Sequence, residues 1–140
     1  ANDTATREAF VAGFWRSGDI GAIDEAGYLR IFDRLKDMIN RGGYKVFSAE
    51  VENALLHHPQ VVEAAVVARP DPVLGERVHA FVTARDPELD ERELRSFCGG
   101  RLADYKVPEV VTIGTAPLPR NAAGKVLKTA LRARIAMETA

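Results

Sequence analysis

At 140 residues, of which 46% are hydrophobic, the chain has the size of one domain with a modest core. Its 19 basic and 20 acidic residues leave a formal charge of -1, so the protein has no overall positive potential that would attract nucleic acid. Charged residues interrupt every hydrophobic run before it reaches the roughly 20 apolar residues that a membrane-spanning helix needs. The lone cysteine, Cys98, and the lack of a signal-peptide-like start predict a reduced, cytoplasmic protein.

The first predicted element is a β-hairpin between residues 20 and 32. Two short apolar runs, Ile20–Ile23 and Tyr28–Phe32, flank Asp24–Gly27, whose acidic residues and glycine suit a turn. The polar opening, residues 2–6, has no hydrophobic period. Three aromatic side chains that precede the hairpin have no clear local partner and indicate a missing neighbour: Phe10, Phe14 and Trp15.

A charged stretch, Asp33–Asp37, follows the hairpin, and we interpret it as a boundary between two packed units where a hinge could sit. Beyond it, residues 38–39 lead to Asn40–Gly43, whose paired glycines permit positive φ values. The strand-like Tyr44–Phe47 comes next. This arrangement predicts a second β-hairpin.

A helix and two strands are predicted in the middle of the chain. Ser48 can cap a helix whose apolar residues recur every four positions until Pro59 stops it. Val61–Ala68 and Val78–Ala84 are rich in valine and alanine and are bounded by prolines. We expect them to be buried strands that pair within one sheet.

The last third predicts two helices around a third strand. Asp90 followed by Glu93 resembles a capping box, so a short helix is expected there, weakened in its middle by Gly99–Gly100. Its apolar face is predicted to consist of Leu94, Phe97, Cys98 and Leu102. A strand at Glu109–Ile113, a loop at Thr115–Gly124 and a helix at Val126–Met137 complete the chain. The predicted fold class is α+β, a small sheet with flanking helices plus N-terminal β-hairpins.

The segment Pro117–Lys125 ends in Gly-Lys and must be compared with a phosphate-binding loop. The Walker pattern needs a glycine where Pro119 stands and Ser or Thr where Val126 stands, so the segment fails. A glycine before a lysine on a proline-stiffened loop instead lets the Lys125 ammonium project into another surface and neutralise charge that develops between two anions. The alternative is a solvated surface lysine beside a helix start.

Four segments occur in a fixed order: Trp15–Asp19, Asp33–Asp37, Gly42–Gly43 and Pro117–Lys125. Together they resemble the adenylate-forming superfamily of acyl-CoA synthetases, luciferases and peptide-synthetase adenylation domains, from about Phe14 to the C-terminus. The resemblance implies that residues 1–33 are the tail end of a large N-terminal domain, residues 34–36 a hinge, and residues 37–140 a C-terminal lid. It implies an enzyme that uses ATP, accompanied by Mg²⁺, to turn a carboxylic acid into an acyl-adenylate and then into acyl-CoA.

The resemblance also assigns roles to single residues. Asp19 is expected to accept hydrogen bonds from the ribose hydroxyls of ATP or AMP, with Ser17 in place of the usual threonine. Arg34 matches the arginine that contacts the nucleotide, Lys36 falls at the hinge, and Lys125 serves the first step as the catalytic lysine. Taken alone, Asp19 could be a turn residue, and the charges at 34 and 36 an exposed cluster.

For the second step, the resemblance implies that Gly42 and Gly43 line a narrow channel for the thiol of CoA. Tyr105 matches an aromatic residue that stacks on the CoA adenine in some ligases. A plain hairpin turn and a residue at the core edge are the alternatives for these positions. Four positions depart from related ligases: Leu74 replaces a tryptophan of some CoA ligases, and Val107 and Glu109 stand where one aryl-CoA ligase branch has cations for CoA phosphates. Asn40 stands where luciferases and plant coumarate ligases carry a lysine, for which Lys45, Lys106 or Arg77 could compensate.

No metal site is predicted, because the histidines and the cysteine lack partners at a recognisable metal spacing: His57, His58, His79 and Cys98. The implied partners are a carboxylic acid, CoA and the N-terminal domain, with no nucleic acid. The acid stays open among malonate, fatty, aryl and other acids. The alternatives are an adenylation domain that loads a carrier protein and a non-catalytic stand-alone lid or interaction module. Without the N-terminal domain, the chain is expected to be inactive.

Overall fold

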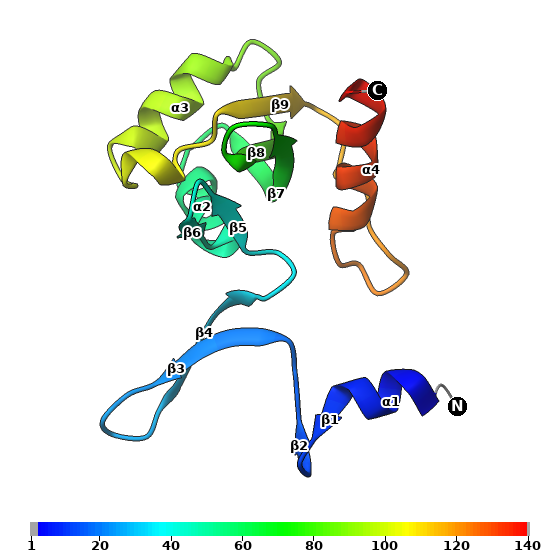
Figure 1. The fold of residues 1–140 in the computed structure, drawn as a ribbon. Helices are drawn as coiled ribbons and strands as arrows, with labels where there is room; N and C mark the ends of the chain where they lie inside the picture. Colours follow the sequence, from blue (N-terminus) through cyan, green and yellow to red (C-terminus); the bar gives the residue numbers. More distant parts are fainter. Residues whose placement is uncertain (1–2, 140) are drawn as a thin grey trace. The chain divides into compact units, whose positions relative to one another are not determined.

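The structure is a computed structural model that describes residues 3–139, and the chain divides between Lys36 and Asp37 into two compact units. The first unit opens with helix α1 (Asp3–Ala9) and a short hairpin of β1 (Phe10–Val11) and β2 (Phe14–Trp15). A longer hairpin of β3 (Asp19–Ile23) and β4 (Leu29–Arg34) follows (Figure 1).

The longer hairpin is the one predicted from the sequence, and Asp24 shapes its turn. Its Oδ1 accepts the backbone N–H groups of Ala26 at 3.0 Å and Tyr28 at 2.9 Å, an Asx-type turn. β4 runs to Arg34, so the first two residues of the predicted boundary stretch belong to the strand. Helix α1 was not predicted, because it buries no residue and its sequence therefore lacks the apolar period of a packed helix.

The second unit is built on a five-stranded sheet. Its strands are β5 (Ile39–Arg41), β6 (Tyr44–Val46), β7 (Val61–Asp71), β8 (Gly75–Ala84) and β9 (Val110–Gly114). The order is β6-β5-β8-β7, and β9 pairs with β8 in parallel. The second predicted hairpin is therefore confirmed, as is the antiparallel β7–β8 pair. Pro70 was predicted to bound the strand but lies inside β7, where an edge strand tolerates its missing N–H.

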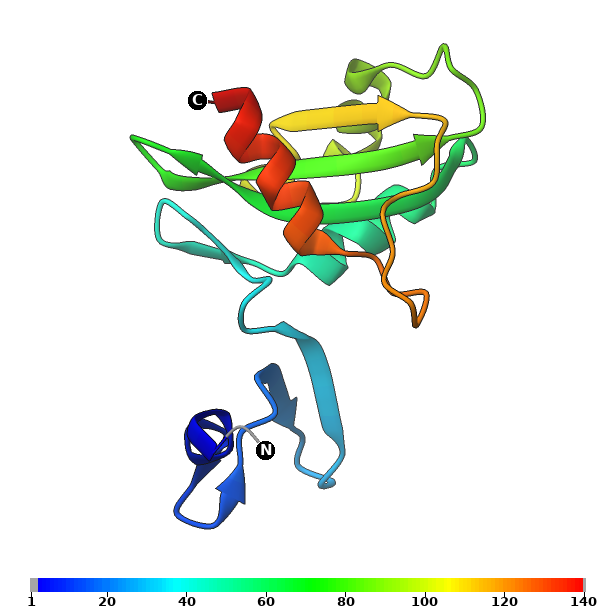
Figure 2. The same ribbon diagram turned by 90° about the vertical axis from the view of Figure 1, so that its right-hand side faces the viewer.

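Helices cover both faces of this sheet, as Figures 1 and 2 show. Helix α2 (Ser48–Leu56) and helix α3 (Glu91–Gly99) pack on one face with alternate residues of β8, including Val78, Ala80 and Val82. Helix α4 (Lys128–Thr139) packs on the other face, against Phe81. Burial on both sides explains the nearly continuous apolar runs of β7 and β8. None of the described helices is long and apolar enough to cross a membrane.

The predicted cap is wrong at the start of α2 and confirmed at the start of α3. Ser48 is the first residue of α2 and not its cap, because the carbonyl of Phe47 already accepts the first helical hydrogen bond, from Glu50 at 3.2 Å. Asp90 does cap α3, and its side chain accepts from the Glu93 N–H at 2.8 Å. The Gly99–Gly100 pair ends α3 and does not interrupt it.

His79 is a buried histidine on the face of β8 that α4 covers. Its side chain is 0% exposed, its Nε2 lies 2.8 Å from Thr112 Oγ1, and its ring stacks on Phe81 with centroids 4.5 Å apart. Within residues 3–139, its Nδ1 is the buried side-chain atom without a hydrogen-bond partner. Burial, aided by the nearby charge of Arg69, lowers the pKa of His79 to about 4.

We expect the free energy of unfolding to fall as the pH is lowered from about 6.5 towards 4. The unfolded imidazole, with a pKa near 6.5, binds a proton over this range that folded His79 does not, which costs about 3 kcal/mol in total. Urea denaturation at several pH values measures the slope. His79→Gln should flatten it. A slope in His79→Gln as steep as in the wild type would contradict the assignment.

Candidate functional site

In the first unit, Asp19 and Arg34 face each other across the longer hairpin. They are cross-strand partners, and Arg34 Nε lies 2.9 Å from Asp19 Oδ1. Ser17 Oγ accepts the Asp19 N–H at 3.2 Å, so the residue in place of the usual threonine fixes the entry to the strand. One carboxylate can accept several hydrogen bonds, so Asp19 keeps capacity for a ligand hydroxyl beside Arg34.

Lys36 lies directly after this pair, at the end of the first unit. A surface hollow of about 460 Å³ is lined by Ser17, Gly18, Arg34, Leu35 and Lys36. The Leu35 N–H donates to the Gly18 carbonyl at 2.8 Å and closes the base of the hairpin. Three of the sequence-predicted residues of this unit, at positions 17, 34 and 36, therefore share one hollow.

In the second unit, Lys125 lies on a loop that Asn121 organises. Asn121 Oδ1 accepts the backbone N–H groups of Ala123 at 3.0 Å and Lys125 at 2.9 Å, and its own N–H donates to the Lys125 carbonyl at 2.9 Å. Gly124 has φ of +79°, which glycine adopts without strain. The Lys125 side chain is exposed, and no described residue pairs with its ammonium. The loop is ordered while its lysine is left available.

Arg120 and Glu63 brace this loop against the sheet. The Arg120 guanidinium donates to the Gly124 carbonyl at 2.6 Å and also forms an ion pair with Glu63. Glu63 additionally accepts the Leu118 N–H at 2.9 Å and the Thr83 hydroxyl at 3.3 Å. The hydrogen bonds from Leu118 and Arg120 lower the pKa of Glu63 below its ordinary value. The Glu63 carboxylate therefore stays ionised, and it is the shared acceptor for the groups of Arg120, Leu118 and Thr83.

Helix α4, which follows the loop, is anchored at two points. Lys128 Nζ lies 2.7 Å from Glu52 Oε1 and donates to the buried Ser48 hydroxyl at 2.8 Å, so the helix start is tied to α2. Arg132 pairs with Asp37 at 2.6 Å, and Asp37 is the first residue of the second unit. Two basic residues of α4, Lys128 and Arg132, are thus engaged inside the second unit.

Gly42 and Gly43 form the turn of the β5–β6 hairpin, with φ of +55° and +92°. A Cβ atom on Gly42 would lie 3.2 Å from Leu74 Cδ2, so Leu74 closes one side of the turn. The adjoining Tyr44 stacks on Tyr105, with ring centroids 4.7 Å apart. The three residues predicted for CoA, at positions 42, 43 and 105, therefore lie close together, because Tyr44 follows the glycines and contacts Tyr105.

The turn has a conformational requirement that stability can report. Gly43→Ala is expected to lower the free energy of unfolding by about 1 kcal/mol, because an L residue at this φ is strained although the space is open. Gly43→Asn should cost less, since asparagine tolerates left-handed backbone. Urea denaturation at neutral pH compares the two variants. Wild-type stability in Gly43→Ala would show that the turn does not need a glycine.

Glu109, which departs from a cation in some ligases, is paired inside the unit. Its carboxylate accepts from Arg41 at 2.7 Å, from Arg77 at 3.3 Å and from the Val78 N–H at 3.2 Å. Burial alone would raise the pKa of Glu109, but these hydrogen bonds outweigh it and lower the pKa. Lys106 pairs with Glu50 at 2.7 Å. Of the three cations that could compensate for the lysine missing at position 40, Arg77 and Lys106 are thus already engaged, whereas Lys45 pairs with no described residue.

The two predicted sets of the second unit are separated from each other. The β5–β6 hairpin and the loop that carries Lys125 lie at opposite ends of the sheet (Figure 2). No group of three His, Cys, Asp or Glu residues within 3–139 is arranged to hold a metal ion. Burial raises the pKa of the Cys98 thiol, which keeps it neutral and unreactive.

The family model described as the AMP-binding enzyme C-terminal domain matches residues 50–125, more than half of the chain. The chain belongs to this family. The matched segment of this C-terminal domain begins at α2 and ends at Lys125, so it includes Tyr105 and the Glu63 brace, while Gly42 and Gly43 precede it.

Curated relatives of this C-terminal domain are CoA ligases. The long-chain-fatty-acid–CoA ligase FadD13 of Mycobacterium tuberculosis is 50% identical over 128 residues, covering 91% of this chain and 25% of that protein. A 2-succinylbenzoate–CoA ligase of Bacillus licheniformis is 42% identical, covering 91% of this chain and 26% of that protein. The chain therefore spans about a quarter of the length of these relatives.

Solved structures confirm the α+β fold of the C-terminal domain. ATP-bound MatB from Rhodopseudomonas palustris matches with a TM-score of 0.86 and 37% identity, over 95% of this chain and 27% of that one. A Mycobacterium tuberculosis fatty acyl CoA synthetase matches with a TM-score of 0.73 and 49% identity, over 93% of this chain and 26% of that one.

Sequence reasoning missed residues that support the Lys125 loop and the helix that follows it. Glu63 and Lys128 are examples, because each acts through partners that are distant in sequence. A signal for Glu63 existed: it is an isolated carboxylate inside a buried run of valine and alanine, where a charge needs partners. Lys128 gave no comparable signal, since its helix position alone suits a solvated lysine.

Proposed function

We propose that the chain works as the C-terminal part of an AMP-forming acyl-CoA ligase, with residues 1–33 closing the larger N-terminal segment and residues 34–36 as the hinge. The observation that carries the proposal is Lys125, an exposed cation that pairs with none of residues 3–139, on a loop held by Asn121 and by the Glu63–Arg120 brace. Lys106 and Lys128, in contrast, are engaged in ion pairs with Glu50 and Glu52.

In the first step, a carboxylate oxygen of the acid attacks the α-phosphorus of ATP. A new oxygen–phosphorus bond forms, the bond to the bridging oxygen breaks, and pyrophosphate leaves with that electron pair. Lys125 donates hydrogen bonds to the oxygens on which negative charge gathers, and its positive charge reduces the repulsion between the two anions. An ordered loop matters here because a preorganised donor needs no rearrangement at the moment of reaction.

Asp19 and Arg34 are proposed to hold the nucleotide during this step. The carboxylate of Asp19 accepts hydrogen bonds from the ribose hydroxyls, and the Arg34 guanidinium, 2.9 Å away, orients it and contacts the nucleotide. The pair suits a nucleotide chemically, because a hydrogen-bond acceptor, Asp19, and a fork-shaped donor, Arg34, lie next to each other on the paired strands β3 and β4. Mg²⁺ bound to ATP would neutralise phosphate charge.

In the second step, the thiolate sulfur of CoA attacks the acyl carbon of the adenylate, and AMP leaves with the electron pair of the broken bond. Gly42 and Gly43 are proposed to border the path of the thiol, and Tyr105 to stack on the adenine. Because this set and Lys125 lie at opposite ends of the sheet, one unit can serve the two steps by presenting each end in turn (Figure 2). Rotation about Lys36 would make that exchange.

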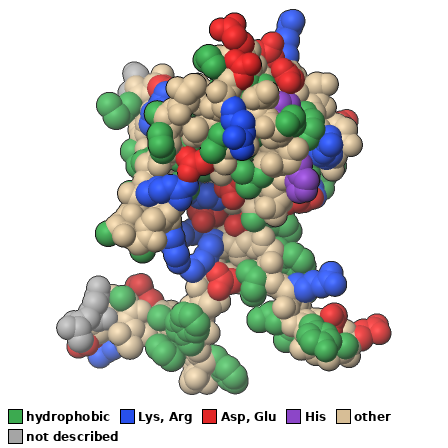
Figure 3. Space-filling model, turned by 180° about the vertical axis from the view of Figure 1, so that it is seen from behind, with side chains coloured by type: hydrophobic (Ala, Val, Ile, Leu, Met, Phe, Trp, Pro, Cys, Tyr) green, Lys and Arg blue, Asp and Glu red, His purple; other side chains and the backbone are tan. Residues whose placement is uncertain are grey.

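The first unit supports the proposal of a larger N-terminal segment. It exposes large apolar side chains that a packed neighbour would cover, and Figure 3 shows hydrophobic side chains at the surface of its hairpins. The exposed residues include Phe10, Val11, Phe14, Trp15, Ile23, Leu29 and Ile31. The missing neighbour inferred from the aromatic residues of the sequence would be this segment.

The test is the acid-dependent exchange of pyrophosphate into ATP, followed by acyl-CoA formation, by the chain joined to the N-terminal segment that its relatives carry. The joined protein is expected to catalyse both, and the 140-residue chain alone neither. Turnover by the isolated chain, or none by a folded joined protein with a range of fatty, aryl and dicarboxylic acids, would overturn the proposal.

A further inference from the structure

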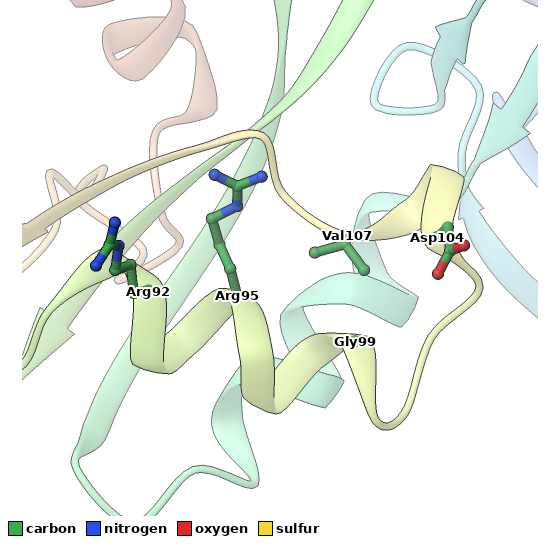
Figure 4. Close-up of a pocket in the computed structure, with 5 residues that line it drawn as sticks. All are labelled: Arg92, Arg95, Gly99, Asp104 and Val107. Carbon is green, nitrogen blue, oxygen red and sulfur yellow. The ribbon is translucent and has the colours of Figure 1, made fainter.

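A hollow outside the proposed catalytic residues is lined by two arginines of helix α3. It measures about 400 Å³ and is bordered by Arg92, Arg95, Gly99, Asp104 and Val107. Figure 4 shows both guanidinium groups leaving α3 on the side of the segment that runs from Val107 into β9, with Asp104 at the other end. The hollow therefore has a basic end and an acidic end.

The arginines are available for a ligand. Arg92 and Arg95 are three positions apart on one helix, where like charges destabilise each other unless an anion lies between them. Arg95 contacts Glu91 at 3.5 Å, but both side chains are about half exposed, so this pair contributes little. In the described part of the chain, Arg92 has no ionic partner. Two guanidinium groups without a strong internal partner match a phosphate monoester, which they can grip with several hydrogen bonds.

The hollow adjoins the residues proposed for CoA. Asp104 and Tyr105 belong to the same short 3₁₀ turn, Asp104–Lys106, which packs against β6, and Tyr105 stacks on Tyr44 next to the paired glycines. Figure 4 shows Asp104 of this turn across the hollow from the arginines, and the stack of Tyr105 on Tyr44 connects the same turn to the paired glycines. The Asp104 carboxylate repels an anion from its own end, so a phosphate is expected at the arginine end.

We infer that Arg92 and Arg95 bind the 3′-phosphate of CoA, an inference that rests on the proposed function. They supply the positive charge that Val107 and Glu109 do not, since position 107 is apolar and Glu109 is neutralised by Arg41 and Arg77. The acceptor is then free CoA. A pantetheine arm attached to a carrier protein has no 3′-phosphate. A site that binds the 3′-phosphate would therefore contribute nothing to the loading of a carrier protein.

The experiment compares CoA with dephospho-CoA as acceptor for the joined ligase. In the wild type, KM for dephospho-CoA should be roughly 10-fold above that for CoA or more, the usual effect of losing a charged hydrogen bond. In the double variant R92Q/R95Q, KM for CoA should rise to that for dephospho-CoA, while KM for dephospho-CoA and pyrophosphate exchange stay near wild type. Arg101→Gln is the matched control, because Arg101 packs on Phe97 and does not border the hollow. It should preserve the preference.

Three results would overturn the inference. One is equal KM values for the two acceptors in the wild type, and another is a double variant that raises both values alike. The third is efficient acyl transfer to a carrier-bound pantetheine with none to CoA. In each of these, pyrophosphate exchange persists and the first step of the proposed function stands. Absence of exchange in the wild type would instead sink the proposed function, and the two failures are therefore distinguishable.

Discussion

Replacing Lys125 by alanine in the joined ligase should lower acid-dependent pyrophosphate exchange by a factor of about 10² to 10³, the usual effect of removing one donor that stabilises developing charge. Its side chain is exposed and unpaired with any described residue, so stability should change by less than about 0.5 kcal/mol. Thioester formation from premade acyl-adenylate and CoA should continue at nearly the wild-type rate, because Lys125 lies at the far end of the sheet from the glycine turn (Figure 2).

The comparison of the two steps decides the role of Lys125. Lys125→Arg is the matched variant: it keeps the charge on a differently shaped donor and should retain part of the exchange activity. Unaffected exchange in Lys125→Ala would reduce the loop to a structural element. Equal loss in both steps would point to a general disturbance of the unit, which circular dichroism and urea denaturation would reveal.

Removing the Glu63 carboxylate is expected to have the second largest effect, on stability and on the first step together. Glu63→Ala removes the acceptor that three groups share: the Arg120 guanidinium, the Leu118 N–H and the Thr83 hydroxyl. The Thr83 hydroxyl can then donate only to the Ala116 carbonyl. We expect a loss of about 2 kcal/mol in the free energy of unfolding. Pyrophosphate exchange should fall, because the Lys125 loop loses the brace that fixes it to the sheet.

Glu63→Gln provides a graded control. The amide oxygen can still accept the Leu118 N–H, but the ion pair with Arg120 is lost, so both effects should be intermediate. The thioester step from premade adenylate should be spared in both variants, which separates a local loss of positioning from global damage. Wild-type exchange in a folded Glu63→Ala protein would show that the brace does not position Lys125.

The sequence predicted the regular parts of the fold because each depends on neighbours in sequence. The β3–β4 and β5–β6 hairpins follow from apolar runs around turn residues, and α2 and the β7–β8 pair from their apolar pattern. Apart from helix α1, which was not predicted, the errors fall at the ends of elements, where single hydrogen bonds decide. Ser48 is the example: its hydroxyl accepts from Lys128, 80 residues away, a contact that no local rule supplies.

Predictions of the site divide in the same way. The resemblance indicated Lys125, Asp19 and the glycine pair, because these lie in short motifs of fixed order. Neither the Arg92–Arg95 hollow nor the Glu63 brace could be predicted, since each depends on segments that approach only in the folded sheet. Glu109 was read as a departure from a cation, and only its pairing with Arg41 and Arg77 explains why the charge there is tolerated.

The ion pair between Arg132 and Asp37 has a mechanical consequence. Asp37 is the first residue beyond the proposed hinge, and Arg132 lies one turn into the helix that follows the Lys125 loop. Lys128 fixes the start of the same helix to α2. Rotation at the proposed hinge would therefore carry α4 and the loop before it together with Asp37 and α2. Lys125 would then move as part of one rigid body with the first residue beyond the proposed hinge.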